Sequence, residues 1–509
     1  MDIFTSLLFL ALILFFLIQA FSSFAFPKNK KLPPGPKPRP ILGSLLELGD
    51  QPHRSLARLS ESYGPLMHLK LGRVTTVVIS STTMAKEVLQ AHGQAVSNRT
   101  ITDASRAHRH SDFSMVMLPV SPLWRNLRKI SNSHLLSSKA LDGNMELRNK
   151  KVQELLNDVH KSVQAGEAVE IASLSFRATL NLLSTTFFSM DMADDTNSVT
   201  LKELKEAMSH MMEELGKPNL ADYFPILRKI DPQGIRRRNT VTFRKLINLF
   251  GRIIDQRLKV REASGLKDDD ILDTLINMMV VDQKKKEDQL DKTIIEHFLL
   301  DLFSAGTETT STTLEWAMAE VIKSPEIMSK ARAELDQVIC KGNQVKESDV
   351  SRLPYIQAIV KEAFRMHPTA PLLIPRKADC DVEICGYTIP KDAQVIVNVW
   401  ALGRDSSTWE NPNKFMPERF LEMDMDVGGR DFKLIPFGAG RRICPGFPLA
   451  MRMLHLMLGS LLHSFDWKLE DGVVPGTLNM EEKFGLTLQM AQPLRAIPVV
   501  TTLSSTVST

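Results

Sequence analysis

The sequence predicts a mainly α-helical protein with small β-sheets, carried by a single large domain. Apolar residues recur three and four positions apart among charged ones, which is the period of an amphipathic helix. The segments with this pattern are 144–164, 200–215, 239–262, 293–322, 325–340 and 354–367. Two other stretches, 66–80 and 382–400, are rich in β-forming residues and contain turn residues, and they predict short strands.

The composition of the 509-residue chain is that of a globular protein with a large core. Hydrophobic residues make up 43% and charged residues 24%, which excludes global disorder. The net charge of +4, from 63 Lys and Arg against 59 Asp and Glu, argues against a nucleic-acid-binding protein. Four cysteines in so long a chain cannot form a disulfide framework and indicate reducing surroundings.

The N-terminus predicts one transmembrane helix. Residues 3–27 carry no charge and include the run LLFLALILFFLIQAF, long enough for a hydrocarbon core of ~30 Å. The alternative is a cleaved secretory signal, whose apolar region would be shorter and preceded by Lys or Arg. Here Asp2 precedes the run and three lysines follow it within residues 28–31. The positive-inside rule therefore indicates a retained signal anchor with the rest of the chain in the cytosol.

The remaining chain divides into a tether, a body and a tail. Residues 28–40 are basic and proline-rich, with five prolines in the nine residues LPPGPKPRP, and proline makes such a segment stiff and extended. Residues 41–500 show no internal repeat or further change of composition, so we expect one domain there. Residues 501–509 are small and mostly polar, as in a flexible tail.

A cysteine motif near the C-terminus carries the strongest functional signal. Five residues of PFGAGRRICPGFPLA fit the pattern F-x-x-G-x-R-x-C-x-G: Phe437, Gly440, Arg442, Cys444 and Gly446. A thiolate ligand to haem iron needs a rigid glycine-rich loop close to the porphyrin, with N–H groups toward the sulfur and a cation for a propionate. Such ligation favours O–O cleavage. The alternative is a buried structural cysteine in a tight turn.

This loop resembles the haem-binding signature of the cytochrome P450 superfamily, and the other motifs extend the resemblance over the whole chain. It implies the cytochrome P450 fold, a haem b (iron protoporphyrin IX) ligated by Cys444, and a monooxygenase that uses O2. It also implies electrons from NADPH through NADPH–cytochrome P450 reductase. With the predicted anchor, we expect a single-pass protein of the endoplasmic reticulum membrane whose catalytic domain is cytosolic.

The long helix predicted at 293–322 carries a second motif. Thr293 and Glu296 form the pattern of a capping box, and AGTETT places glycine and threonines where helix propensity disfavours them. Such a locally weak helix can open a groove for O2 and water. The resemblance implies that Glu308 and Thr309 are catalytic and relay protons during oxygen activation. The alternative is a threonine-rich packing face with a surface glutamate.

Other residues match the scaffold and cofactor positions of the resembled family. Glu362 and Arg365 lie one turn apart in KEAFRMHP, and Arg419 follows in FMPERF. The resemblance implies that these three form a buried structural network behind the haem loop, costly to break. Besides Arg442, the residues expected to hold the haem are Trp124 and Arg128 of a W-x-x-x-R helix, Arg376 and Arg99. Arginine suits the propionates because its planar fork donates in pairs.

We expect a mostly apolar substrate pocket. The runs FSMVML, LLDLFSA, APLLI and FGL lie where the resembled family lines this pocket, and they hold few charges. The residues expected there are Met115, Leu302, Phe303, Ala305, Ala370, Leu373, Ile374, Phe484 and Leu486. Their content indicates a mid-sized lipophilic substrate, and the alternative is that these runs are ordinary core.

Further segments resemble the plant group that includes geraniol hydroxylases: YGPLMHLKLG, NLADYFPIL, DPQGIRRR and EEKFGLTLQMAQPLRAIP. This resemblance favours hydroxylation of a terpenoid, such as a geraniol-like monoterpenol or a diterpene. Oxidation of an alkaloid or phenolic precursor, or of a xenobiotic, stays open. A haem-thiolate isomerase or dehydratase that needs no reductase, and a non-enzymatic haem carrier, are weaker alternatives because the acid–threonine pair and the cysteine loop are intact.

Two remaining groups of residues concern the surface. Basic residues that can attract a reductase to the face of the cysteine loop are Arg125, Arg128, Lys129, Lys433 and Arg441. His108 and His110 are interpreted as surface histidines because no partner motif supports a metal site.

Overall fold

The computed structural model describes residues 31–500 apart from 194–200, 266–269, 282–289, Lys341 and Asp471, and before residue 31 it describes Ile13 alone. The anchor predicted at 3–27, Ile13 aside, and the tail predicted at 501–509 therefore lie outside the described residues. Within the part of the chain that is described, no helix has both the length and the apolar character needed to cross a membrane. The described end of the tether, residues 31–40, forms neither a helix nor a strand.

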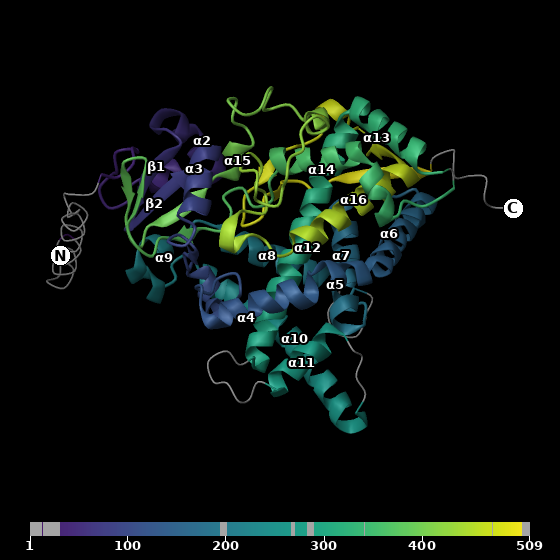
Figure 1. Cartoon of the computed structure of the whole chain (residues 1–509), viewed down its shortest axis with the longest axis horizontal. Coiled ribbons are helices and arrows are strands. Elements are labelled where there is room, and N and C mark those ends of the chain that lie inside the picture. The colour runs from purple at the N-terminus through teal and green to yellow at the C-terminus, as the bar shows by residue number, and fades with distance from the viewer. Residues whose placement is uncertain are drawn as a thin grey trace, which may run out of the picture.

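Helices make up most of the described fold (Figure 1). The α-helices are α2 (Pro52–Tyr63), α3 (Thr82–Lys86), α4 (Pro122–Ile130), α5 (Ser138–Gly143), α6 (Met145–Ala165), α7 (Ile171–Phe188), α8 (Leu201–Gly216), α9 (Leu220–Tyr223), α10 (Ile235–Ser264), α11 (Ile271–Val281), α12 (Lys292–Lys323), α13 (Pro325–Val338), α14 (Pro354–Met366), α15 (Val399–Leu402) and α16 (Phe447–Ser464). All six helices predicted from periodicity are present, as α6, α8, α10, α12, α13 and α14.

Periodicity does not predict α7, and the burial of its side chains explains why. Polar residues at Ser175, Thr179, Asn181 and Ser184 are as buried as the phenylalanines of this helix. An amphipathic pattern requires polar side chains to mark the exposed face. In α7 polarity and exposure are uncoupled, because the helix packs along α12 in the interior of the molecule.

The strands form small sheets, the largest of which has the order β1-β2-β8-β5-β3. The strands of this sheet are β1 (Leu66–Leu71), β2 (Val74–Ile79), β3 (Asn98–Arg99), β5 (Arg376–Lys377) and β8 (Gln394–Val397). The others are β4 (Val169–Glu170), β6 (Val382–Ile384), β7 (Tyr387–Ile389), β9 (Phe465–Leu469), β10 (Glu482–Lys483), β11 (Gln489–Met490) and β12 (Arg495–Val500). The antiparallel register of β3 and β5 sets Arg99 directly opposite Arg376.

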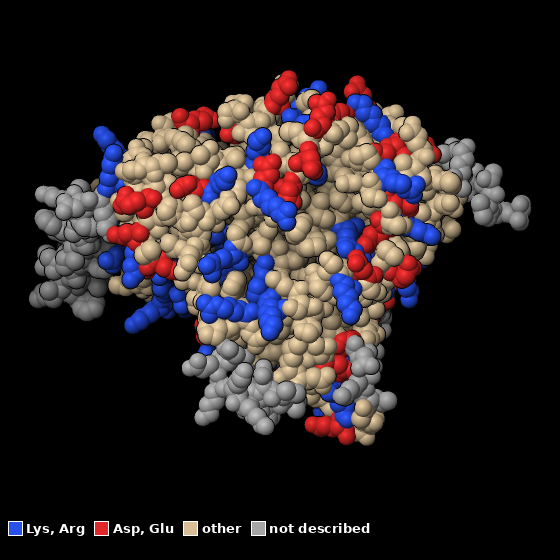
Figure 2. All heavy atoms as spheres, in the orientation of Figure 1, with Lys and Arg blue, Asp and Glu red and all other residues tan. Residues whose placement is uncertain are grey.

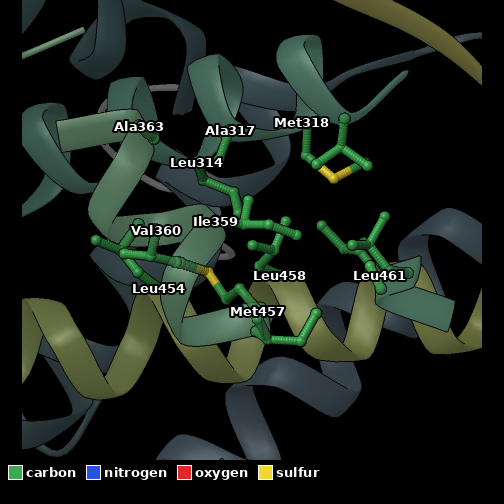
Figure 3. Close-up of a cluster of buried hydrophobic side chains, with 14 of the residues drawn as sticks. Leu314, Ala317, Met318, Ile359, Val360, Ala363, Leu454, Met457, Leu458 and Leu461 are labelled. Carbon is green, nitrogen blue, oxygen red and sulfur yellow. The ribbon is translucent and has the colours of Figure 1, made fainter. Parts of the chain in front are cut away.

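The main core lies where α12 crosses α14 and α16 (Figure 3). Leu314 and Met318 of α12 pack with Ile359 of α14 and Leu458 of α16, all essentially without solvent exposure. Trp316 is fully buried as well, so the C-terminal half of α12 is covered on every side. A helix buried all round is held by its neighbours along its whole length, which fixes the position of the AGTETT segment.

The first turn of α12 differs from the predicted capping box. The N-cap is Asp291, whose carboxylate accepts a hydrogen bond of 2.7 Å from the N–H of Ile294. Because an aspartate already stands at the preferred capping position, Thr293 lies inside the helix, and Glu296 lies 3.7 Å from Lys292 instead of capping the backbone. The capping-box prediction is therefore wrong, although the predicted helix start is within one residue.

Candidate active site

The Cys444 loop runs from a 3-10 turn (Gly440–Arg442) to the start of α16. The N–H of Cys444 donates to the carbonyl of Phe437 at 2.9 Å, which closes the loop. Burial raises the pKa of the Cys444 thiol, while the backbone N–H of Gly446, the charge of Arg128 and the N–H of Phe447 act in the opposite direction. N–H groups directed at the sulfur are the feature that a thiolate ligand requires.

The structure requires glycine at one of the two glycine positions of the motif and not at the other. Gly440 has a φ of +69°, and a Cβ at this position would lie 2.6 Å from the carbonyl oxygen of Leu89, so both conformation and space demand glycine. Gly446 has ordinary backbone angles, and a Cβ there would lie 3.8 Å from the Cys444 sulfur. Within the protein alone, Gly446 is therefore not required, and its predicted purpose of admitting a porphyrin stays a prediction.

Three arginines meet beside this loop. Arg99 and Arg376 come from the paired strands β3 and β5, and Arg442 comes from the loop itself. Their guanidinium groups donate to backbone carbonyls: Arg99 to Ile374 at 2.6 Å, Arg376 to Ala439 at 2.8 Å and Arg442 to Leu118 at 2.5 Å. Among the described residues no carboxylate forms an ion pair with any of the three.

This arginine cluster fits an anionic group. Burial lowers the pKa of Arg376 to about 10, and burial together with the charges of Arg376 and Arg128 lowers that of Arg442 to about 10. The Nη1 of Arg376 is buried and has no hydrogen-bond partner among the residues that the structure describes. A group of buried cations that repel one another is costly unless a negative charge joins them, and the two propionates of a haem would supply that charge.

Trp124 and Arg128, both from α4, complete the predicted set. The guanidinium of Arg442 lies 4.5 Å from the centre of the Trp124 ring, and Arg128 is close enough to Cys444 for their charges to interact. Both side chains line the same cavity as Cys444. The structure thus brings the sulfur and every predicted haem-binding side chain to one place.

The cavity above Cys444 has a volume of about 310 Å3. Its wall on the α12 side contains Leu302, Ala305, Gly306 and Thr309. Of the predicted pocket residues, those that line this cavity are Met115, Leu302, Ala305, Ala370, Leu373 and Ile374. The lining is mostly apolar, as the sequence predicts.

Three predicted pocket residues lie elsewhere. Phe303 is fully buried and stacks on Phe188, with ring centres 5.2 Å apart, so it belongs to the core beside α7. Phe484 and Leu486 line a neighbouring cavity of about 490 Å3, which shares Arg99, Leu373 and Ile374 with the first. The placement of Phe303 in the substrate pocket is therefore wrong, and Phe484 and Leu486 lie at the second cavity.

The two predicted proton-relay residues face different directions. The hydroxyl of Thr309 donates to the carbonyl of Ala305 at 2.6 Å, and Thr309 lines the cavity. Glu308 is only 3% exposed and accepts a hydrogen bond from Ser209 of α8 at 2.9 Å and another from Gln489 of β11. Burial raises the pKa of Glu308. Glu308 therefore does not line the cavity, because neighbouring helical residues point about 100° apart.

The AGTETT segment stays helical throughout. The hydroxyls of Thr307, Thr309 and Thr310 each bond the carbonyl four residues earlier, so the polar side chains are satisfied within the helix itself. A Cβ on Gly306 would lie 2.9 Å from Leu183 of α7. The glycine thus permits close packing with α7, and the expected groove is not formed by a break in the helix.

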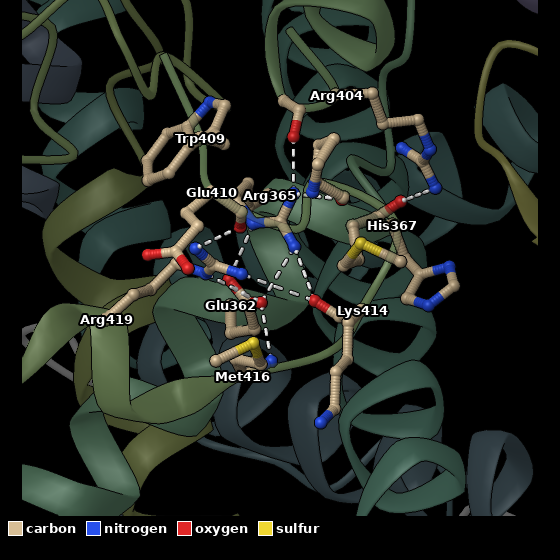
Figure 4. A network of polar contacts seen from close by, with 12 residues as sticks. Glu362, Arg365, His367, Arg404, Trp409, Glu410, Lys414, Met416 and Arg419 are labelled. Atoms are coloured by element: carbon tan, nitrogen blue, oxygen red, sulfur yellow. Dashed lines mark hydrogen bonds and ion pairs between the residues drawn. The ribbon is translucent and has the colours of Figure 1, made fainter. Parts of the chain in front are cut away.

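The predicted Glu–Arg–Arg network is present and buried (Figure 4). Arg365 forms two hydrogen bonds of 2.7 Å with Glu362, and Arg419 forms one of 3.1 Å. Glu362 also accepts from the N–H of Met416 at 2.7 Å, and Arg365 donates to three carbonyls, including that of Gly403. Neither Glu362 nor Arg365 is exposed. Each charged group is therefore hydrogen-bonded, which a buried ion pair needs.

This network is connected to the Cys444 loop through aromatic packing. The ring of Phe437 lies 5.1 Å from Phe364 of α14 and 5.6 Å from Phe447 of α16, centre to centre. Since α14 also carries Glu362 and Arg365, the network and the loop rest on the same helix. Phe437 lines the cavity as well.

One buried polar cluster was not predicted from the sequence. His108 is exposed, but His110 is only 6% exposed, so the surface interpretation is wrong for His110. His110 lies 2.8 Å from His297 and 3.1 Å from Asp301, nitrogen to nitrogen and nitrogen to oxygen. The available signal was Asp301 itself, a charged residue in the middle of the apolar run LLDLFSA.

Most of the predicted basic docking residues are on the surface. Arg125, Lys129, Lys433 and Arg441 are exposed, whereas Arg128 is half-buried and lines the cavity. Figure 2 shows lysine and arginine side chains gathered over the part of the molecule that contains α4.

The fold and the site together define a haem-thiolate monooxygenase. A cysteine loop with directed N–H groups, an arginine cluster and an apolar cavity under a long helix are its components. The chain belongs to the cytochrome P450 family, whose model matches residues 33–494. Membership implies a haem cofactor, O2, and electrons from a redox partner.

The chain has a sequence identity of about one half to several named plant enzymes. It is 53% identical to a geraniol 8-hydroxylase of Swertia mussotii over 481 residues, covering 94% of this chain and 96% of the relative. It is 52% identical to a geraniol 8-hydroxylase of Catharanthus roseus over 489 residues, covering 96% and 98%. A drimenol monooxygenase of Persicaria hydropiper is 52% identical over 468 residues, covering 92% of each chain.

Proposed function

We propose that this protein hydroxylates a mid-sized lipophilic terpenoid, with a geraniol-like monoterpenol as the first candidate. The observation that carries this proposal is the mostly apolar cavity that connects Cys444 with Thr309. The names of the similar enzymes support it, since they act on geraniol and drimenol. Diterpenes, phenolic or alkaloid precursors and xenobiotics are the other lipophilic classes to be compared.

The residues of this chain have separate tasks in the proposed reaction. Cys444 ligates the iron of haem b, and the arginines at 99, 376 and 442 hold its propionates. When bound, the haem supplies the activation of O2 and its insertion into a C–H bond. Thr309 moves a proton at its hydroxyl on the cavity side, and Glu308 supplies protons from the α8 side of α12. The apolar wall orients the substrate and excludes water.

NADPH–cytochrome P450 reductase is the proposed electron donor, docked on the basic face over α4. The exposed side chains of Arg125, Lys129 and Arg441 give this face its charge. Electrostatic steering weakens with salt because the Debye length is about 10 Å at 0.1 M. Turnover should therefore fall as ionic strength rises, and a rate indifferent to salt contradicts the docking face.

The proposed location is the endoplasmic reticulum membrane, with residues 3–27 as a retained anchor, 28–40 as a tether and the catalytic domain in the cytosol. The uncharged run followed by lysines supports this topology. Protease added outside sealed microsomes should digest the catalytic domain. Protection of the domain until detergent is added contradicts the topology.

The decisive experiment begins with the reduced, CO-bound difference spectrum of membranes that contain the full-length protein. Absence of a Soret band typical of thiolate ligation overturns the proposed function. Turnover with NADPH and reductase then compares geraniol, drimenol, a diterpene, a phenolic amine and a herbicide by product analysis. Product that forms without NADPH indicates an isomerase or dehydratase instead.

A further inference from the structure

A single acidic side chain lines the cavity above Cys444 among the residues that the structure describes, and it is Asp301 of α12. Its side chain is 94% buried, with 6% exposed. A carboxylate in an apolar wall is costly unless hydrogen-bond donors surround it. Neither the proposed haem contacts nor the proton relay uses Asp301, so its presence calls for another explanation.

Donors from one side hold the Asp301 carboxylate in place. The hydroxyl of Ser114 lies 2.9 Å from both oxygens, the N–H of Val116 donates to Oδ2 at 3.4 Å, and Nε2 of His110 lies 3.1 Å from Oδ1. Burial lowers the pKa of His297 to about 3, so this ring is neutral. His297 can then donate its Nδ1 proton to His110, and His110 its Nε2 proton to Asp301.

These donors leave part of the acceptor capacity of Asp301 unused. An ionised carboxylate offers about four lone-pair positions on its two oxygens. Ser114, Val116 and His110 supply three donor hydrogens, all from the 3-10 segment Ala104–Asp112 and the residues directly after it. Because Asp301 lines the cavity, a hydroxyl group of a ligand bound there can donate to the remaining position.

The position of Asp301 on α12 relates it to the reacting end of the cavity. Asp301, Ala305 and Thr309 follow one another at intervals of four residues and therefore share one face of the helix. All three line the cavity. Asp301 and Thr309 are eight residues apart, or roughly 12 Å along the axis, which is comparable to the length of an extended acyclic monoterpenol.

We propose that Asp301 accepts a hydrogen bond from a hydroxyl group of the substrate and so determines specificity. The preferred substrates are then lipophilic alcohols, bound with the hydroxyl at Asp301 and oxidised at the end remote from it, near Thr309. This inference rests on the proposed function and narrows its substrate class. It separates alcohols from hydrocarbons and ethers of the same size.

A purely structural task for Asp301 is the competing explanation. Carbonyls of the segment that it holds also accept hydrogen bonds from the haem-side arginines: that of Val116 from Arg99 at 3.3 Å, and those of Met115 and Leu118 from Arg442 at 3.4 and 2.5 Å. Loss of Asp301 could therefore loosen the wall and weaken every ligand equally. The test must separate this general loss from a loss that is specific to alcohols.

The first measurement uses the haem-loaded full-length enzyme without any substitution. The ligand-induced difference spectrum gives dissociation constants for geraniol and for geranyl methyl ether, which has the same skeleton but no hydroxyl proton. A hydrogen bond to a carboxylate should make the alcohol bind about tenfold more tightly. Equal binding, or tighter binding of the ether, overturns the inference, while the CO difference spectrum of the same sample tests the proposed function separately.

The second measurement repeats the comparison with three variants. Asp301→Ala should reduce the alcohol-to-ether preference to about one, and Asp301→Asn should leave an intermediate preference because the amide oxygen still accepts. Ser304→Ala is the matched control, since its hydroxyl bonds the carbonyl of Leu300 in the same helix at 2.6 Å and the residue does not line the cavity, so it should keep the preference. An unchanged preference in Asp301→Ala overturns the inference. If the variants load too little haem, the wild-type comparison decides alone.

Discussion

Behind the Cys444 loop, Glu362, Arg365 and Arg419 form a largely buried ion network in which each charged group is hydrogen-bonded, whereas in front of it the cavity wall is mostly apolar. The threonines of that wall bond their own helix. The two regions therefore have different tasks. A polar network fixes the geometry of the cofactor loop, and shape with a few polar groups selects the ligand.

The largest effect is expected where the two regions meet, at Cys444. Cys444→Ser should abolish the thiolate-type Soret band of the reduced, CO-bound protein and reduce product formation to background, because no other cysteine lines the cavity among the described residues. Cys380→Ser is the matched control, since that thiol is exposed. Retention of the band in Cys444→Ser would falsify the assignment of the iron ligand.

The next largest effect concerns the stability that the network behind the Cys444 loop gives to the protein. Arg365→Ala leaves the Glu362 carboxylate buried with fewer partners, which costs about 3–5 kcal/mol of unfolding free energy. Arg109→Ala breaks an exposed pair with Asp112 at 3.0 Å and should cost less than about 1 kcal/mol. Chemical denaturation with haem loading measured in parallel compares the two, and equal losses contradict the structural role of the network.

We also expect the stability of the protein to depend on pH through a buried histidine of α16. Burial, with the charge of Lys361 as a second cause, lowers the pKa of His455 on α16 from 6.5 to about 4. The unfolded state therefore binds this proton first, so stability present above pH 6.5 declines as the pH falls toward 4, by about 3 kcal/mol at most.

The variant His455→Gln tests this effect. It should flatten the stability profile in that window and leave it unchanged above pH 7. Denaturation at several pH values checks the prediction, and parallel profiles for the two proteins would refute it.

The smallest effect belongs to the cavity side. Thr309→Ala should keep NADPH oxidation but lower the product formed per NADPH several-fold, because a positioned proton donor contributes to productive turnover. Thr313→Ala is the matched control, since its hydroxyl bonds the carbonyl of Thr309 at 2.9 Å without lining the cavity. Oxygen-consumption and product assays measure the coupling, and unchanged coupling in Thr309→Ala removes its assigned role.

The sequence predicted the polar side better than the cavity side, for a physical reason. Motifs such as Glu362-x-x-Arg365 place both partners on one helical turn, so their contact follows from helix geometry and is present as expected. The mainly α fold with small sheets and the cytochrome P450 family are confirmed. The anchor at 3–27 stays a prediction.

The errors concern directions that only packing determines. Phe303 lies next to Leu302 in the chain, yet it points about 100° away from it and into the core beside Phe188. Phe484 and Leu486 lie in the connection between β10 and β11, and no local pattern fixes which of two cavities such a connection reaches. The surface prediction for His110 is wrong because its partners are 187 and 191 residues away in the chain.

Because α12 is an unbroken helix, the number of its residues determines which side chains face the cavity. Thr309 contributes to the cavity, and its neighbour Glu308 to the contact with α8 and β11, so the helix is a wall with a different chemistry on each side. Inserting or deleting one residue before this point would rotate everything beyond it by about 100° and turn Thr309 away from the cavity. A substitution in α12 therefore alters the contacts of one side chain, whereas a change of its length alters the contacts of every residue that follows.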